Sequence, residues 1–233
     1  MRSGKDATKV AGLPRCSPSL KRGATLNPYY SMKITPTRLF TLITASALPA
    51  FAQSGKPDAE GFIRDWLVLA PLSIGASSGA DAIDQQQFAT EAQPAAKEGS
   101  KQKAGNKELE WRKVATKEFY IDFREMHPNE GEQVVGWAVA YIISPDDKSG
   151  LTLRMNSNDQ GKVYLNGEEV IKFTETRSLE KETEDSARNI TLKKGANVLV
   201  FKVVNEENNW QGSVRFMTQS GRPVTDLKVE TKP

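Results

Sequence analysis

SNDQGKVYLNGEEV, residues 157–170, carries the strongest structural signal in the chain. Asn166-Gly167 separates two short runs of alternating apolar residues, Lys162–Leu165 and Glu169–Phe173. An Asn-Gly pair in this setting favours a type I′ turn, which needs positive φ at both central residues. The stretch therefore predicts a β-hairpin, which the turn Asn158-Asp-Gln-Gly161 leads into.

The N-terminal quarter has the features of an export signal. Residues 1–31 are basic and lack apolar periodicity, which is typical of a disordered or wrongly assigned leader. Residues 32–52 combine a short positive region, an apolar run over Leu39–Leu48 and the small-residue pattern Ala50-Phe-Ala52. We expect a signal peptide there, with a secreted or periplasmic mature chain that starts at Gln53. A buried apolar segment of a cytosolic protein is the alternative.

Cleavage at that site changes how the composition is read. The chain has 32 Lys and Arg against 29 Asp and Glu, but residues 1–52 contain eight of those basic residues and one acid. Residues 53–233 are then left with 32 − 8 = 24 basic and 29 − 1 = 28 acidic residues, a net charge near −4. This balance argues against a nucleic-acid partner. The only cysteine, Cys16, lies in the leader, so the mature chain has no disulfide and depends on its apolar core.

The rest of the chain predicts a succession of strands. We expect a flexible lead-in over 53–61 and one domain over 62–230. Its first strand is Phe62–Pro71, with apolar residues on both faces, and a long loop follows at 73–107. The further expected strands are Leu109–Val114 paired with Phe119–Phe123, then Val134–Ile143, Leu151–Met155, Asn189–Leu192, Val198–Val204, Ser213–Met217 and Leu227–Val229.

Many short strands with turn residues between them and little helical periodicity indicate an all-β protein. We expect an antiparallel β-sandwich with jelly-roll connections. A barrel remains the alternative, because periodicity does not separate the two.

The order of these motifs resembles galactose-binding-like β-sandwich modules of exported bacterial proteins. The resemblance rests on Trp66-Leu-Val-Leu-Ala-Pro71, Val163-Tyr-Leu-Asn-Gly167, Leu192–Lys202 and Trp210–Arg215, and it covers about Phe62 to Val229. It implies a carbohydrate-binding-module type of domain without catalytic activity. The chain departs from the family at Asn158, where relatives often have an acid, and at Leu165, where they often have an aromatic residue.

Two loops hold the candidate ligand-binding residues. Trp210 is the candidate for stacking on a sugar, with Asn208, Asn209 and Gln211 as hydrogen-bonding partners for hydroxyls. Its alternative role is a tryptophan that plugs the end of the sandwich. Asn158 and Asp159 can supply oxygen ligands to calcium. Because the sequence supplies no further ligands at EF-hand spacing, the preferred role for Asn158 and Asp159 is to cap the turn before the hairpin.

The residue inventory limits the enzymatic alternatives. His127 is the single histidine and lies in a loop, and no nucleophile motif accompanies it. We expect no metal and no cofactor other than calcium, no catalytic residues and no membrane anchor. The expected function is glycan recognition through end loops. A protein-interaction or assembly module of the cell envelope is the alternative, and a carboxylate-based glycoside hydrolase is the third reading.

Overall fold

The computed structural model describes residues 55–233. The predicted leader at 1–31 and the predicted signal peptide at 32–52 lie outside the described residues. The elements are β1 Asp65–Ser73, α1 Gly79–Ala82, β2 Lys101–Ala104, β3 Lys107–Glu110, β4 Arg112–Ala115, β5 Ile121–Asp122, α2 Phe123–Met126, β6 Val134–Ser144, β7 Lys148–Ser157, β8 Gly161–Leu165, β9 Glu168–Phe173, β10 Asp185–Leu192, β11 Gly195–Asn205, β12 Gln211–Met217 and β13 Lys228–Glu230.

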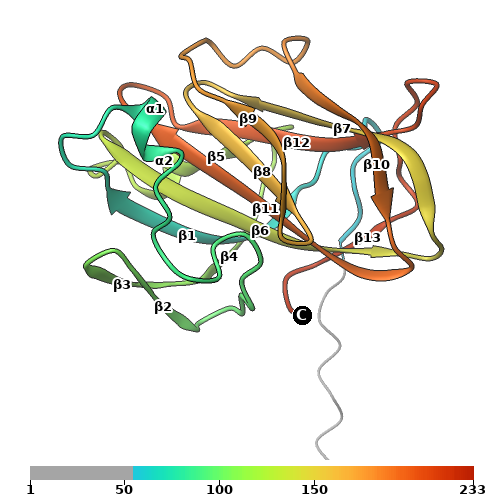
Figure 1. Ribbon diagram of the computed structural model, residues 1–233, viewed down its shortest axis with the longest axis horizontal. Coiled ribbons are helices and arrows are strands. Elements are labelled where there is room, and N and C mark those ends of the chain that lie inside the picture. The colour runs from blue at the N-terminus through green and yellow to red at the C-terminus, as the bar shows by residue number, and fades with distance from the viewer. Residues whose placement is uncertain (1–54) are drawn as a thin grey trace, which may run out of the picture. The chain divides into compact units, whose positions relative to one another are not determined.

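The strands form an antiparallel β-sandwich (Figure 1). Sheet A has seven strands in the order β4-β1-β6-β11-β8-β9, with β13 also paired to β6, and sheet B has four in the order β10-β7-β12-β5. From β6 onward the chain passes repeatedly from one sheet to the other, which is the connection pattern of a jelly roll. The predicted fold class is confirmed.

The hairpin predicted from residues 157–173 is present. Strands β8 and β9 pair with Val163 opposite Ile171. Asn166 and Gly167 have φ values of 52° and 88°, as a type I′ turn requires. The Asn166 side chain also holds the turn against β11, because its Oδ1 accepts from the amide of Val198 at 2.9 Å.

Strand β6 explains why the molecule has two apolar cores. Its small residues Gly136, Ala138 and Ala140 face sheet B, and they leave room there for large side chains such as Trp66, Phe201 and Trp210. Its bulky residues point the other way. They form a second core on the outer face of sheet A.

Residues 74–111 build the cover for that second core, and we call them the cover segment. Ile83, Phe88 and Trp111 pack there against the bulky face of β6. Phe88 meets Trp137 edge to face, with ring centroids 5.3 Å apart. The long loop predicted at 73–107 is therefore a packed layer that contains α1, the β2–β3 ribbon and well-buried apolar side chains.

A buried ion pair fixes the cover segment to sheet A. Lys202 on β11 is fully buried, and its Nζ lies 2.8 Å from a carboxylate oxygen of Glu91. The ammonium also donates to the carbonyl of Gln85 at 2.6 Å. Burial lowers the pKa of Lys202, and the carboxylate of Glu91 counteracts this effect.

One prediction about local pairing is wrong. The segments around 109–114 and 119–123 do not pair with each other, because β4 pairs with β1 and β5 pairs with β12. The lead-in predicted at 53–61 makes several hydrogen bonds over its described part, from Gly55 onward. Gly55 exchanges backbone hydrogen bonds with Val229, and Asp58 accepts hydrogen bonds from the amides of Glu60 and Phe62.

Candidate functional site

The candidate site is a depression at the end of the sandwich where β7, β11 and β12 meet their loops. It has a volume of about 450 Å³. We call it the end depression. Its lining comprises Asn158, Asp159, residues 176–179, residues 207–209 and Gln211. Every predicted ligand-binding residue except Trp210 therefore lies on this one hollow, although they come from two loops far apart in sequence.

Asn158 is the structural centre of the end depression. Its side chain is buried, and its Oδ1 accepts from the amide of Gln211 at 2.7 Å. Its Nδ2 donates to Oδ1 of Asn205 at 3.3 Å and to the carbonyl of Asn209. These bonds tie the turn before the hairpin to the loop after β11. The side chain of Asn158 therefore joins two distant loops, which differs from the local turn capping that the sequence favoured.

Asp159 braces the same loop from its other side. Its Oδ2 accepts from the amide of Glu206 at 2.9 Å. Burial raises the pKa of Asp159, and the nearby carboxylates of Glu206 and Glu207 act in the same direction, while the backbone hydrogen bonds counteract them. Asp159 is thus a buried acceptor that holds the loop after β11 in place.

The calcium role has little support in this geometry. In residues 55–233, no three His, Cys, Asp or Glu side chains are grouped so that they can hold a metal ion. Asn158 and Asp159 direct their side-chain oxygens at backbone amides. Both amides flank the distant loop after β11, so these oxygens hold two loops together.

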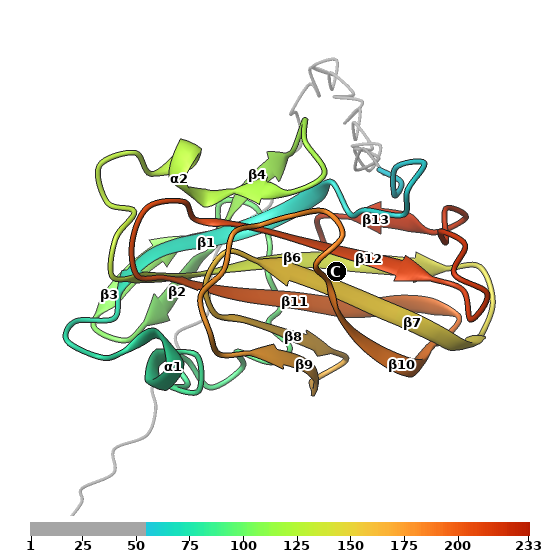
Figure 2. The same ribbon diagram turned by 90° about the horizontal axis from the view of Figure 1, so that it is seen from above.

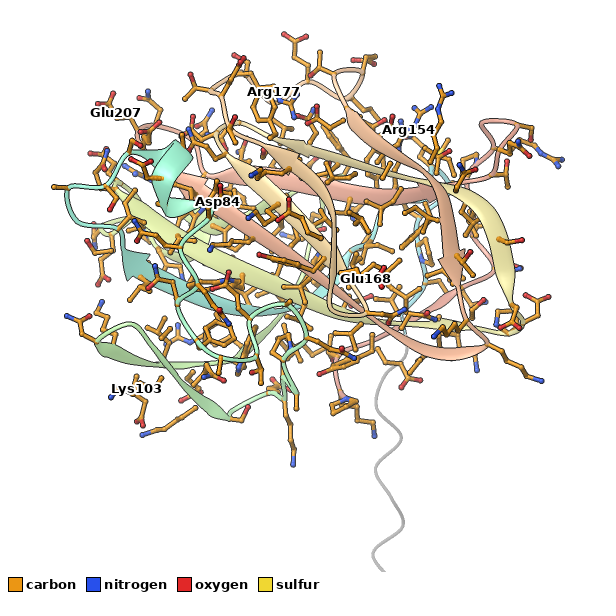
Figure 3. All side chains as sticks on the ribbon, in the orientation of Figure 1. Asp84, Lys103, Arg154, Glu168, Arg177 and Glu207 are labelled. Carbon is orange, nitrogen blue, oxygen red and sulfur yellow. The ribbon has the colours of Figure 1, made fainter. Side chains whose placement is uncertain are left out.

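Arg177 forms the opposite wall of the end depression. Its backbone amide donates to the carbonyl of Asn158 at 2.6 Å, and its Nε donates to the carbonyl of Ser157 at 3.0 Å. The guanidinium lies 3.8 Å from the ring centroid of Phe173 and pairs with Asp185. Arg177 and Glu207, which both line the end depression, are labelled in Figure 3. Neither the sequence pattern nor the resemblance indicated Arg177, because it lies in an irregular, acid-rich segment.

The prediction for Trp210 is wrong. Its side chain is 0% exposed, stacks on Phe123 with ring centroids 4.9 Å apart, and donates from Nε1 to the carbonyl of Val203. A Cβ at Gly136 would lie 2.8 Å from its ring. Trp210 fills the core below the end depression, so no indole face is available to a sugar. The exposed polar residues at the rim are Glu207, Asn208 and Asn209 on one side and Thr176 and Ser178 on the other.

A larger hollow, of about 570 Å³, lies at the other end of the sandwich. Its lining includes Asp146, Lys148 and Asp226. Lys148 pairs with both of these carboxylates, at 3.1 and 2.8 Å. Its principal charges are therefore satisfied within the chain, whereas the rim of the end depression presents two adjacent exposed amides, Asn208 and Asn209.

No family model matches the chain, and no curated protein matches it. The all-β sandwich is compatible with a galactose-binding-like domain. Among the described residues, no helix has the length and apolar character to cross a membrane.

Proposed function

We propose that the chain is an exported, non-catalytic glycan-binding module of the galactose-binding-like kind, and that it binds through the end depression. The observation that carries the proposal is the convergence of Asn158, Asp159, residues 207–209 and Gln211 around one hollow. Side-chain amides offer both a donor and an acceptor, which is the combination that sugar hydroxyls need.

The bonding within the walls supports a binding role for the rim. Asn158 and Asp159 hold the loop after β11, and Arg177 holds the facing wall. The rim is thereby pre-organised, which lowers the entropic cost of binding a ligand. Because Trp210 is buried, the binding energy comes from hydrogen bonds, and we expect weak affinity for a single sugar unit and a gain from multivalent display.

A glycan array with residues 53–233 tests the proposal, followed by calorimetric titration of the best ligand. Asn208 has a φ of 64°, so Asn208→Gly removes the rim amide without backbone strain. We expect this variant and Glu207→Ala each to raise Kd by about 3- to 10-fold, the loss of one hydrogen bond. Gln219→Ala, an exposed amide on the opposite hollow, is the matched control and leaves Kd unchanged.

Three outcomes would contradict this proposal. Absence of binding to any glycan would favour a protein-interaction or assembly module of the cell envelope. Binding that Asn208→Gly and Glu207→Ala leave intact would move the glycan site away from the end depression. Release of reducing sugar from a bound glycan would instead favour the hydrolase reading.

A further inference from the structure

A second cluster of polar side chains lies on the outer face of sheet B. Arg154 on β7 and Arg215 on β12 are cross-strand partners, and both point away from the core. Asn156 and Ser213 are the neighbouring pair on the same face. Two like charges opposite each other on adjacent strands repel, so this arrangement requires an anion between them.

The chain supplies that anion from the segment between β9 and β10, residues 174–184, which we call the strap. Seen from above, the strap crosses over sheet B (Figure 2). Glu184 at its end is almost fully buried. Its Oε2 lies 3.2 Å from Nη1 of Arg154 and 2.5 Å from Nη2 of Arg215. Figure 3 shows Arg154 on this outer side.

The bonding in this cluster is incomplete. Oε1 of Glu184, Nε of Arg215, Oδ1 of Asn156 and Oγ of Ser213 are all buried without a hydrogen-bond partner in the described part of the chain. Asn156 and Ser213 are 0% and 3% exposed. Buried polar groups are normally satisfied, and a group of unsatisfied ones on one face marks a place built for another ligand.

An aromatic surface adjoins the arginine pair. Phe62 is bridged to Arg215, whose guanidinium lies 4.5 Å from the Phe62 ring centroid, and Phe119 packs beside Phe62. Lys181 of the strap lies over both rings, 5.8 and 5.4 Å from their centroids, and pairs with Glu60. The strap therefore covers a surface that combines aromatic rings, guanidinium groups and hydroxyl-matching polar groups.

The strap is attached to the sandwich by polar contacts and has no apolar anchor in either core. Its contacts with sheet B are polar. They come from Glu184, from Arg177, whose Nε donates to the carbonyl of Ser157, and from the bonds of Asn156 to the carbonyl of Glu180 and to Thr183. Lys181 pairs with Glu60 beside the sheet. None of its side chains belongs to either apolar core. Segments with few buried apolar contacts open locally at low free-energy cost.

We propose that Arg154 and Arg215 form a carboxylate-binding site that Glu184 occupies in the closed state, and that an acidic saccharide binds there when the strap lifts. The carboxylate of a uronic acid unit replaces that of Glu184 in the guanidinium pair, which is the geometry that favours arginine as a carboxylate partner. The sugar hydroxyls meet Ser213 and Asn156, and the sugar ring lies against Phe62 and Phe119. This site lies beside the end depression, and residues 176–179 of the strap also line that depression.

Titration with trigalacturonate, by calorimetry, tests the proposal. Glu184→Ala removes the internal competitor, and we expect its affinity for trigalacturonate to exceed that of the wild type by about tenfold or more. Glu184→Ala should not bind the methyl-esterified trisaccharide more tightly than the wild type does. Arg215→Gln in the Glu184→Ala background should abolish the gain in affinity for trigalacturonate. Glu182→Ala is the matched control, because Glu182 is an exposed acid of the same strap.

A second measurement uses the wild-type chain and does not depend on the folding of Glu184→Ala. Hydrogen exchange of the amides in 176–184 is expected to accelerate when trigalacturonate is added, because the ligand displaces Glu184 and releases the strap. A folded Glu184→Ala variant without the gain in affinity overturns the proposal. So does unchanged exchange in the strap at saturating trigalacturonate. Asn208→Gly serves as a cross-check, since it weakens the end depression and leaves this site unaffected.

Discussion

At the scale of single residues, the main lesson concerns Trp210. The sequence NNWQG places an aromatic ring among amides, which is the pattern of a sugar-binding loop, and yet the indole is buried. The information that identifies its true position lies elsewhere, in the small residues Gly136, Ala138 and Ala140. A strand face without large side chains must be filled from the opposite layer. Its neighbours Asn208 and Asn209 are exposed at the rim, whereas Gln211 is part-buried and donates from Nε2 to Asp122.

Trp210→Ala is expected to act on stability. Removing a buried indole that stacks on Phe123 should lower the free energy of unfolding by about 3–5 kcal/mol. Urea denaturation measures this value. Asn209→Ala, an exposed neighbour, should stay within about 0.5 kcal/mol of wild type. A stable Trp210→Ala variant that specifically loses glycan binding would contradict the buried role.

His127 predicts a pH dependence. Burial lowers its pKa from the ordinary value of 6.5, with Arg112 and Lys107 acting in the same direction and Glu130 against them. The unfolded chain then binds the proton more tightly. The stability associated with the neutral ring is complete above pH 6.5 and is lost as the pH falls through that value toward the lower folded-state pKa.

The measurement is the difference in unfolding free energy between wild type and His127→Gln, taken between about pH 5 and pH 7.5. The other titrating groups cancel in this difference. We expect the wild type to lose stability relative to the variant as the pH falls. A difference that stays constant across the range would show that His127 has an unperturbed pKa.

At the scale of elements, strands defined by alternation were predicted well, and their partners were predicted less well. The hairpin of β8 and β9 depends on a local turn, so Asn166-Gly167 was sufficient to identify it. The pairing of β4 with β1 depends on contacts that are distant in sequence. The cover segment was missed as a packed layer because its apolar residues are sparse. Strand Phe62–Pro71 did predict apolar contacts on both faces, and that requires a layer outside sheet A.

The ion pair of Lys202 and Glu91 is expected to determine how firmly the cover segment is attached. Lys202→Met and Glu91→Gln each alter one member of the buried pair. We expect Glu91→Gln to lower the free energy of unfolding by about 3–5 kcal/mol, because it leaves an unpaired ammonium. The double variant should recover a large part of that loss. A double-mutant cycle in urea gives the coupling energy, and Lys101→Met in the exposed pair with Glu108 is the control. Additive single effects would mean that the pair is not coupled.

At the scale of the whole molecule, the sandwich was predicted from its strands, and export remains a proposal. We expect the secreted form to begin at Gln53, two residues before the described fold starts at Gly55. Mass spectrometry of the protein recovered from the periplasm or the medium measures the N-terminus. A terminus well upstream of Gln53, or retention in the cytosol, would contradict the signal peptide.

The bridge between Gly55 and Val229 has a consequence for how this module is attached to anything else. Val229 lies opposite Ile142, which pairs with Asn197 near the start of β11, whereas the rim residues follow Asn205 at the other end of that strand. The eight residue steps from Asn197 to Asn205 correspond to about 26 Å along β11. The chain therefore enters and leaves the fold at the end of the sandwich that is remote from the end depression. A fusion partner or surface tether joined at either point leaves the rim facing outward. The whole module can also be inserted into a loop of another protein without covering its rim.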